Sequence, residues 1–165
     1  MSWSEPISRR AVLGLSATGL AGCGFTLRQP PKLPFAGIAL TGFAPRSPMA
    51  AELRRQLALQ VRVQDTVDRV DVVLQALDDV RERSVVASTS SAEVRELQLR
   101  VKLNFRAHTP AGRELIPRAE LLLARDLSYI ENAALAKEYE EAELFREMQA
   151  DVVSQVLRRL AAVQV

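Results

Sequence analysis

Polar and apolar side chains alternate almost without a break from Val94 to Ala107, and no other stretch constrains the fold as strongly. The apolar set comprises Leu97, Leu99, Val101, Leu103 and Phe105, and the polar set comprises Gln98, Arg100, Lys102, Asn104 and Arg106. Successive side chains of a strand point to opposite faces of its sheet, so a period of two separates the two sets. The pattern predicts a half-buried antiparallel strand, with one face on a core and the other in water or against a polar partner.

A turn and a second strand follow this stretch. Thr109–Gly112 has proline and glycine at positions that suit a turn. The next strand is predicted from about Arg113 to Leu127, so that residues 94–127 form a long hairpin. Pro117 has no backbone N–H to donate, which places this second strand at a sheet edge or at a bulge.

The preceding part of the chain is predicted to contain a helix between strands. Phe35–Phe43 is a short apolar run bounded by prolines, as a first strand would be. Ser47 has the preference of an N-cap and is followed by proline, so a helix is predicted over 48–60. Alternation with a period of two returns over 61–64 and again over 70–77 and predicts two further strands.

The C-terminal part has the composition of a helix. Residues 132–163 contain neither Gly nor Pro and are rich in helix-forming residues. Apolar side chains recur at helical spacing along one side: Phe145, Met148, Val152, Val156, Leu160 and Val163. This stripe would cover the sheet. The order of elements predicts an α+β two-layer sandwich, with two helices packed on one face of a mostly antiparallel four-stranded sheet.

The first 22 residues have the features of a secretory signal peptide. Arg9 and Arg10 precede Ala11–Gly22, a run of small and apolar residues without charge. This run is too short to span a bilayer as a helix, which needs about 20 residues. Paired arginines occur in twin-arginine signals and in ordinary export signals, so the export route stays open.

The only cysteine of the chain comes directly after this run. Leu20–Cys23, LAGC, resembles the lipobox of bacterial lipoproteins, in which the cysteine is acylated and becomes the first residue of the mature chain. The resemblance predicts Cys23 as a lipidation site, the alternative being a buried free thiol. Several acyl chains would make the anchor stable, whereas a single chain binds a membrane only marginally. Gly24 stands where aspartate is associated with inner-membrane retention, so sorting to the outer membrane is implied.

Three segments are therefore predicted: a signal peptide over 1–22, a lipid-anchored proline-rich tether over 23–34, and one α/β domain over 35–165. Cleavage removes Glu5, Arg9 and Arg10, so the formal net charge falls from +2 to +1. This charge gives no argument for binding nucleic acid.

The residues of the mature chain do not form a recognisable catalytic motif. Its one histidine, His108, lies beside the predicted hairpin turn. The sequence has no G-x-S-x-G elbow, glycine-rich phosphate loop or clustered metal ligands. Glu140 and Glu141 are interpreted as part of a solvated helix face, and Ser88–Ser91 as a flexible loop between strands. We predict a protein that is not an enzyme and that needs neither a cofactor nor a metal.

Three stretches together resemble the lipopolysaccharide-assembly lipoprotein LptE family: CGFTLR at 23–28, ELIPRAELLLARDLSYIENAALAKEYE at 114–140 and LFREMQADVVSQVLRRL at 144–160. They cover about half of the mature chain, in the order expected for that family. The resemblance implies an outer-membrane lipoprotein, lipid-anchored on the periplasmic side, that sits inside the large LptD β-barrel and partly plugs it. It also implies binding of lipopolysaccharide during its insertion into the outer leaflet.

The resemblance further implies a ligand site. In the family, basic residues near one end of the sheet meet the anionic sugar-phosphate part of lipopolysaccharide, and one of these positions matches Lys137. A second position falls near the serine-rich loop, where this chain has Ala87 and Ser88 in place of a cation. The nearest cations there are Arg81, Arg83 and Arg95. The polar strand face that includes Arg100 would suit the polar lumen of a barrel.

A second function class stays open from the residues alone. A lipid-anchored periplasmic adaptor or activator of another envelope-assembly machine would show the same lipobox and a similar small domain. Co-purification with a barrel protein from solubilised outer membranes would distinguish the two.

Overall fold

The computed structural model describes residues 31–88, 94–128 and 134–165, without the side chains of Val94, Arg95 and Ala134. The predicted signal peptide, the predicted lipidation site Cys23 and the tether up to Pro30 lie outside these residues, and so do Thr89–Ser91 of the predicted loop.

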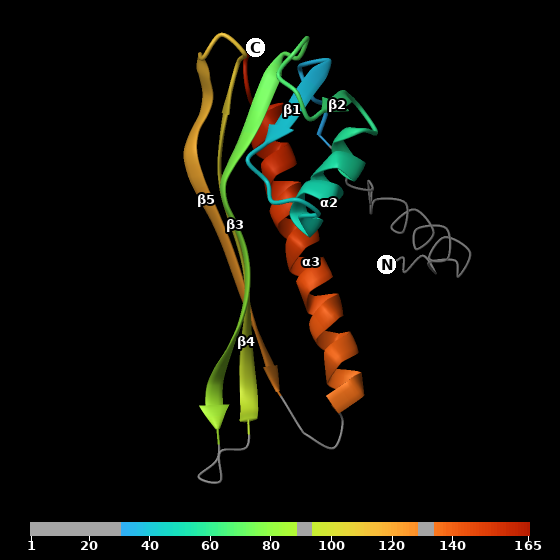
Figure 1. The fold of residues 1–165 in the computed structure, drawn as a ribbon, viewed down its shortest axis with the longest axis vertical. Coiled ribbons are helices and arrows are strands. Elements are labelled where there is room, and N and C mark those ends of the chain that lie inside the picture. The colour runs from blue at the N-terminus through green and yellow to red at the C-terminus, as the bar shows by residue number, and fades with distance from the viewer. Residues whose placement is uncertain (1–30, 89–93, 129–133) are drawn as a thin grey trace, which may run out of the picture. The chain divides into compact units, whose positions relative to one another are not determined.

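The described residues form a five-stranded sheet in the order β2-β1-β3-β4-β5 (Figure 1). The elements are β1 (Gly37–Thr41), α2 (Pro48–Leu57), β2 (Arg62–Gln64), β3 (Val72–Ser88), β4 (Val94–His108), β5 (Glu114–Ser128) and α3 (Ala134–Ala161). β1 runs parallel to both β2 and β3, whereas β3, β4 and β5 are antiparallel.

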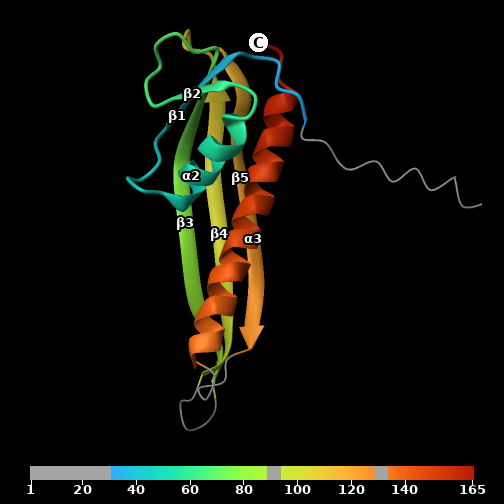
Figure 2. The ribbon, with the colours of Figure 1, turned by 90° about the vertical axis from the view of Figure 1, so that its right-hand side faces the viewer.

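Both helices cover the same face of the sheet, as the sequence predicted (Figure 2). The sheet has five strands and not the four stated for the architecture, because the short strand predicted over 61–64 also joins it, as β2 at one edge. β2 is only three residues long and joins the sheet through parallel pairing of Gly37 with Arg62. The strand predicted over 61–64 is therefore present, and its pairing with β1 places it at the sheet edge.

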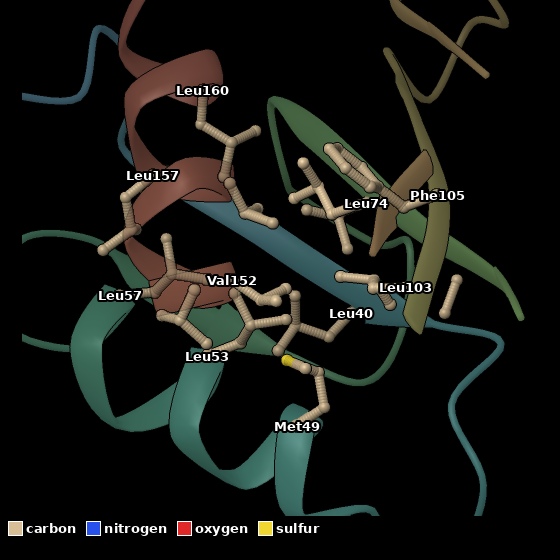
Figure 3. Packing of buried hydrophobic residues seen from close by; sticks show 14 of the residues in the cluster. Leu40, Met49, Leu53, Leu57, Leu74, Leu103, Phe105, Val152, Leu157 and Leu160 are labelled. Carbon is tan, nitrogen blue, oxygen red and sulfur yellow. The ribbon is translucent and has the colours of Figure 1, made fainter. Parts of the chain in front are cut away.

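The core lies between the sheet and the two helices (Figure 3). The apolar set of β4 is buried throughout, and Leu103 and Phe105 have no exposed surface. Val152 and Leu160 of α3 pack toward these side chains from the helix side of the sheet. α2 contributes further residues to the same core, among them Leu53. The apolar face predicted for residues 94–107 is therefore the core face.

A β-bulge at Leu77 changes which residues of β3 face the core. Ala76 pairs with Phe105 and Asp78 pairs with the adjacent Asn104, so Leu77 is an extra residue. Before the bulge the even-numbered residues Val72, Leu74 and Ala76 are buried. Beyond it, the odd-numbered residues point to the helix side, because a bulge offsets the alternation by one.

The loop after β1 makes a close approach to this bulge. Gly42 has a φ of +79°, and a Cβ added there would lie 2.2 Å from the carbonyl oxygen of Ala76. The turn leads to Ser47, whose Oγ accepts a hydrogen bond from the backbone N–H of Ala50 and donates one to Asp79 Oδ2 at 2.5 Å. Ser47 is therefore the N-cap of α2, as predicted, and it also fastens the helix to β3.

The strand pairing is incomplete or irregular on both sides of the sheet. β5 is the last strand in the order, and its register shifts between Ala119 and Ile116, around Pro117. This confirms the prediction of a strand at a sheet edge or at a bulge, and β5 has both features. On the other side, β1 pairs with β3 only as far as Gln75, so that the rest of β3 has no neighbouring strand on that side among the described residues.

Candidate functional site

Three charged residues of β3 lie on the sheet face that the helices cover, and we call Asp79, Arg81 and Arg83 the charged row. Their partners in β4 are the buried residues Leu103, Val101 and Leu99. Directly paired residues of an antiparallel sheet point to the same face, so the charged row points to the helix side. The bulge at Leu77 causes this orientation, since it offsets the alternation immediately before the row.

The N-terminal half of α3 faces the charged row with polar residues. Lys137, Glu141 and Phe145 follow one another at intervals of four residues and therefore share one side of the helix. Phe145 belongs to the core and is 4% exposed. The side chains of Glu141 and Lys137 are 20% and 17% exposed. The sheet-facing stripe of α3 thus continues toward its N-terminus in charged residues.

Two contacts join the charged row to this side of α3. The guanidinium of Arg81 lies 3.8 Å from the ring centroid of Phe145, a cation–π contact. Arg83 Nη1 donates to Glu141 Oε2 at 3.2 Å. Burial lowers the pKa of the Arg81 guanidinium below its ordinary value, and Glu141 opposes this shift. Charged groups therefore hold β3 against the N-terminal half of α3. We call this contact, which involves Arg81, Arg83, Lys137, Glu141 and Phe145, the charged seam.

Lys137 belongs to the first turn of α3, and α3 begins at the end of the sheet where β3 ends (Figure 1). Its Nζ donates to Glu140 Oε2 at 2.7 Å, one helical turn away. The structure thus places Lys137, Arg81 and Arg83 along one seam. Arg95, the fourth predicted cation, belongs to β4, and its side chain lies outside the described part of the chain.

The structure separates the two neighbouring glutamates that the sequence grouped together. Glu140 is 51% exposed and fits the predicted solvated face. For Glu141 the prediction was wrong, since its carboxylate is turned toward the seam and pairs with Arg83. The signal that could have found it is spacing: Glu141 precedes Phe145 of the apolar stripe by four residues.

The opposite sheet face carries the polar set of β4, whose groups pair with neighbouring strands. Lys102 Nζ lies 2.7 Å from Asp78 Oδ2, and this hydrogen bond lowers the pKa of Asp78 and raises that of Lys102. Arg106 Nε donates to Gln75 Oε1 at 2.8 Å. Cations and anions alternate over this face, so it is polar without a dominant charge.

A cleft of about 660 Å³ lies elsewhere, beside the loop between β1 and α2. Its lining includes Thr41, Phe43, Arg46 and Arg54. Arg54 forms an ion pair with Asp65 there. None of the predicted ligand residues lines this cleft, so the cleft and the charged seam are separate features of the domain.

Comparison with known proteins places this fold in a family. Residues 35–160 match the family model LptE, described as lipopolysaccharide-assembly. The chain belongs to the LptE family. The match begins two residues before β1 and ends in the last turn of α3. It therefore includes the sheet, both helices and the charged seam of this LptE-family domain.

Individual relatives agree with this assignment. The LPS-assembly lipoprotein LptE of Photorhabdus laumondii is 28% identical over 157 residues, which cover 92% of this chain and 84% of the relative. The solution structure of an uncharacterized lipoprotein B from Nitrosomonas europaea is 30% identical, with a TM-score of 0.71, and covers 84% of this chain and 91% of its own. The crystal structure of rare lipoprotein B from Shewanella oneidensis is 25% identical, with a TM-score of 0.62, over 76% of this chain and 94% of its own.

Among the residues that the structure describes, no helix is both long and apolar enough to span a membrane.

Proposed function

We propose that this chain is an outer-membrane lipoprotein that sits inside an LptD β-barrel, partly plugs it, and binds lipopolysaccharide while it is inserted into the outer leaflet. The observation that carries the proposal is the LptE family match over residues 35–160. The proposed role is binding and plugging, and it requires no catalysis by this chain.

The polar sheet face supports the proposed place inside a barrel. The lumen of a large barrel is polar, and a protein that fills it needs a polar surface without a strong net charge. The face that includes Arg100, Lys102 and Asp78 has this character, and its charged groups are already partly neutralised by one another. We infer that this face is turned toward the barrel wall.

The charged seam supports the proposed ligand site. Arg81, Arg83 and Lys137 provide three cations along the N-terminal half of α3. A guanidinium can bind a phosphate through two parallel hydrogen bonds, and an ammonium acts as a point charge. We therefore propose that these residues, with Arg95 of β4, receive the anionic sugar-phosphate part of lipopolysaccharide.

Replacing Lys137 with glutamate is expected to weaken lipopolysaccharide binding at low salt by on the order of tenfold, equivalent to about 1.4 kcal/mol. The substitution places a second anion beside Glu141 and removes a cation. Binding should also weaken with salt, because exposed charges are screened over about 8 Å at physiological ionic strength. The measurement is affinity for purified lipopolysaccharide, together with co-purification with LptD from solubilised outer membranes, which should be unchanged.

Lys32→Glu is the matched control for this variant, since it makes the same charge change at an exposed lysine outside the seam. Equal affinities of the wild type and Lys137→Glu would remove Lys137 from the site. If the wild-type chain co-purified with a different envelope machine instead of LptD, the adaptor function would replace the one proposed.

We also propose that Cys23 is acylated and anchors the chain. The mass of the mature wild-type protein should correspond to a chain that begins at residue 23 and carries acyl groups. Cys23→Ala should accumulate as an unprocessed precursor, because the residue that accepts the lipid is missing. An unmodified cysteine in the wild type, or cleavage at another position, would contradict this proposal.

A further inference from the structure

The carboxylate of Glu141 occupies a position among the cations of the seam. It accepts a hydrogen bond from Arg83 at 3.2 Å, and it lies one helical turn from both Lys137 and Phe145, on whose ring Arg81 rests. Its side chain is 20% exposed, whereas that of Arg83 is 55% exposed. An internal anion therefore lies where the proposed site offers positive charge.

The pair between Arg83 and Glu141 is one that another anion can displace. It rests on a single hydrogen bond, and Arg83 reaches solvent with more than half of its side chain. Ion pairs at a solvent-exposed surface are weak. A phosphate group offers the same guanidinium several acceptor oxygens and a geometry that allows two parallel hydrogen bonds.

The other cations of the seam do not depend on Glu141 in the same way. Arg81 is held against the face of Phe145 at 3.8 Å, and Lys137 is paired with Glu140. Release of Glu141 would therefore free Arg83 while Arg81 keeps its aromatic support. The arrangement allows Arg83 to change partner without disturbing the core.

We propose that Glu141 is an internal competitor of the anionic ligand: its carboxylate holds Arg83 in the free protein and is displaced when a phosphate group of the ligand binds. This inference rests on the proposed function of the seam as a lipopolysaccharide site. Glu141 thereby lowers the affinity of the site and makes release of the ligand easier, because its carboxylate is at hand to take Arg83 back.

Glu141→Gln tests this proposal, with Glu143→Gln as the matched control. Both variants remove one negative charge from α3, but Glu143 is 57% exposed and pairs with Arg146, whereas Glu141 pairs with Arg83. The full-length protein is titrated with purified lipopolysaccharide at low salt. Glu141→Gln is expected to bind about two- to fivefold more tightly than the wild type, the range given by loss of a weak competing pair. For Glu143→Gln we expect a gain in affinity of less than about twofold.

A double variant identifies the partner of Glu141. In an Arg83→Gln background, Glu141→Gln should lose most of its gain, since the guanidinium that it frees is absent. A gain that persists in this background would overturn the proposal, because it would then reflect net charge alone. Thermal unfolding of each variant shows whether folding is retained, and Glu141→Asp, which keeps the carboxylate, should bind less tightly than Glu141→Gln.

The failure of this inference can be told apart from failure of the proposed function. If Lys137→Glu weakens binding while Glu141→Gln binds no better than Glu143→Gln, the site stands and Glu141 is not a competitor. Weaker binding by Glu141→Gln would show that the carboxylate orients Arg83 for the ligand, which also overturns the inference. If the wild type does not bind lipopolysaccharide, or if neither Lys137→Glu nor Arg83→Glu weakens binding, the proposed site itself fails.

Discussion

Replacing Leu103 with alanine is expected to lower the free energy of unfolding by about 2–5 kcal/mol. Leu103 has no exposed surface and lies at the centre of the sheet, where its neighbours across the strands are Asp79 and Leu121. Truncation removes buried apolar surface and leaves a cavity between sheet and helices that surrounding side chains fill only in part. Chemical denaturation followed by circular dichroism measures the loss.

Lys102→Ala is the control for this prediction, because Lys102 is the adjacent residue on the opposite face of the same strand. Its side chain is 33% exposed, and its partner is the half-exposed Asp78. We expect its truncation to change stability little, since such pairs contribute weakly. Similar unfolding midpoints for the two variants would mean that Leu103 does not face the core.

Gly42→Ala is expected to cost about 3 kcal/mol or more, because two effects act at one position. The φ of +79° is unfavourable for any residue with a Cβ, and the added carbon would lie 2.2 Å from the carbonyl oxygen of Ala76. That oxygen belongs to the backbone of β3 beside the bulge. β3 cannot move away from the added carbon without breaking its pairing with β1 and β4. The thermal unfolding midpoint should fall accordingly.

Gly112→Ala separates the two effects. Gly112 also has a positive φ, of +91°, but a Cβ there would meet no atom within 4 Å. We expect this variant to lose only the conformational contribution, about 1–2 kcal/mol. Equal losses for Gly42→Ala and Gly112→Ala would show that the loop after β1 moves away from β3 and that the close approach carries no cost.

The parts of the fold that the sequence predicted are those where periodicity runs unbroken. Residues 97–107 alternate over their whole length, and the strand β4 and its core face follow directly. The hairpin to β5 and the edge position of Pro117 follow from turn chemistry and from the missing N–H. The helix α3 follows from its apolar stripe.

The part that periodicity could not predict is β3 beyond Ala76. A strand was expected over 70–77, but β3 continues to Ser88. The extra residue Leu77 reverses the alternation, and the charged row beyond it lacks the apolar side chains that normally mark the covered face. Here the strand forms because it pairs with β4, and its own sequence pattern does not indicate this pairing.

The same reason limited the prediction of the site. Lys137 was identified by resemblance, and Arg81, Arg83 and Arg95 only as the cations nearest to a second family position. The orientation of the β3 arginines depends on the bulge and on the packing of α3. Glu141 was missed because a glutamate within a charged helical segment normally faces water. Only its spacing from Phe145 indicates otherwise.

The unpaired edge of β3 has a consequence for aggregation. A long strand edge with free backbone donors and acceptors is a template on which another chain can add a strand. Beyond Gln75 this edge begins with the bulge at Leu77, and its register breaks again between Val85 and Ser88. The charged side chains of Asp79, Arg81 and Arg83, which point to the helix side, would lose contact with water if a second copy added a strand there. The charged row thus discourages self-association of the domain before any ligand or partner has arrived.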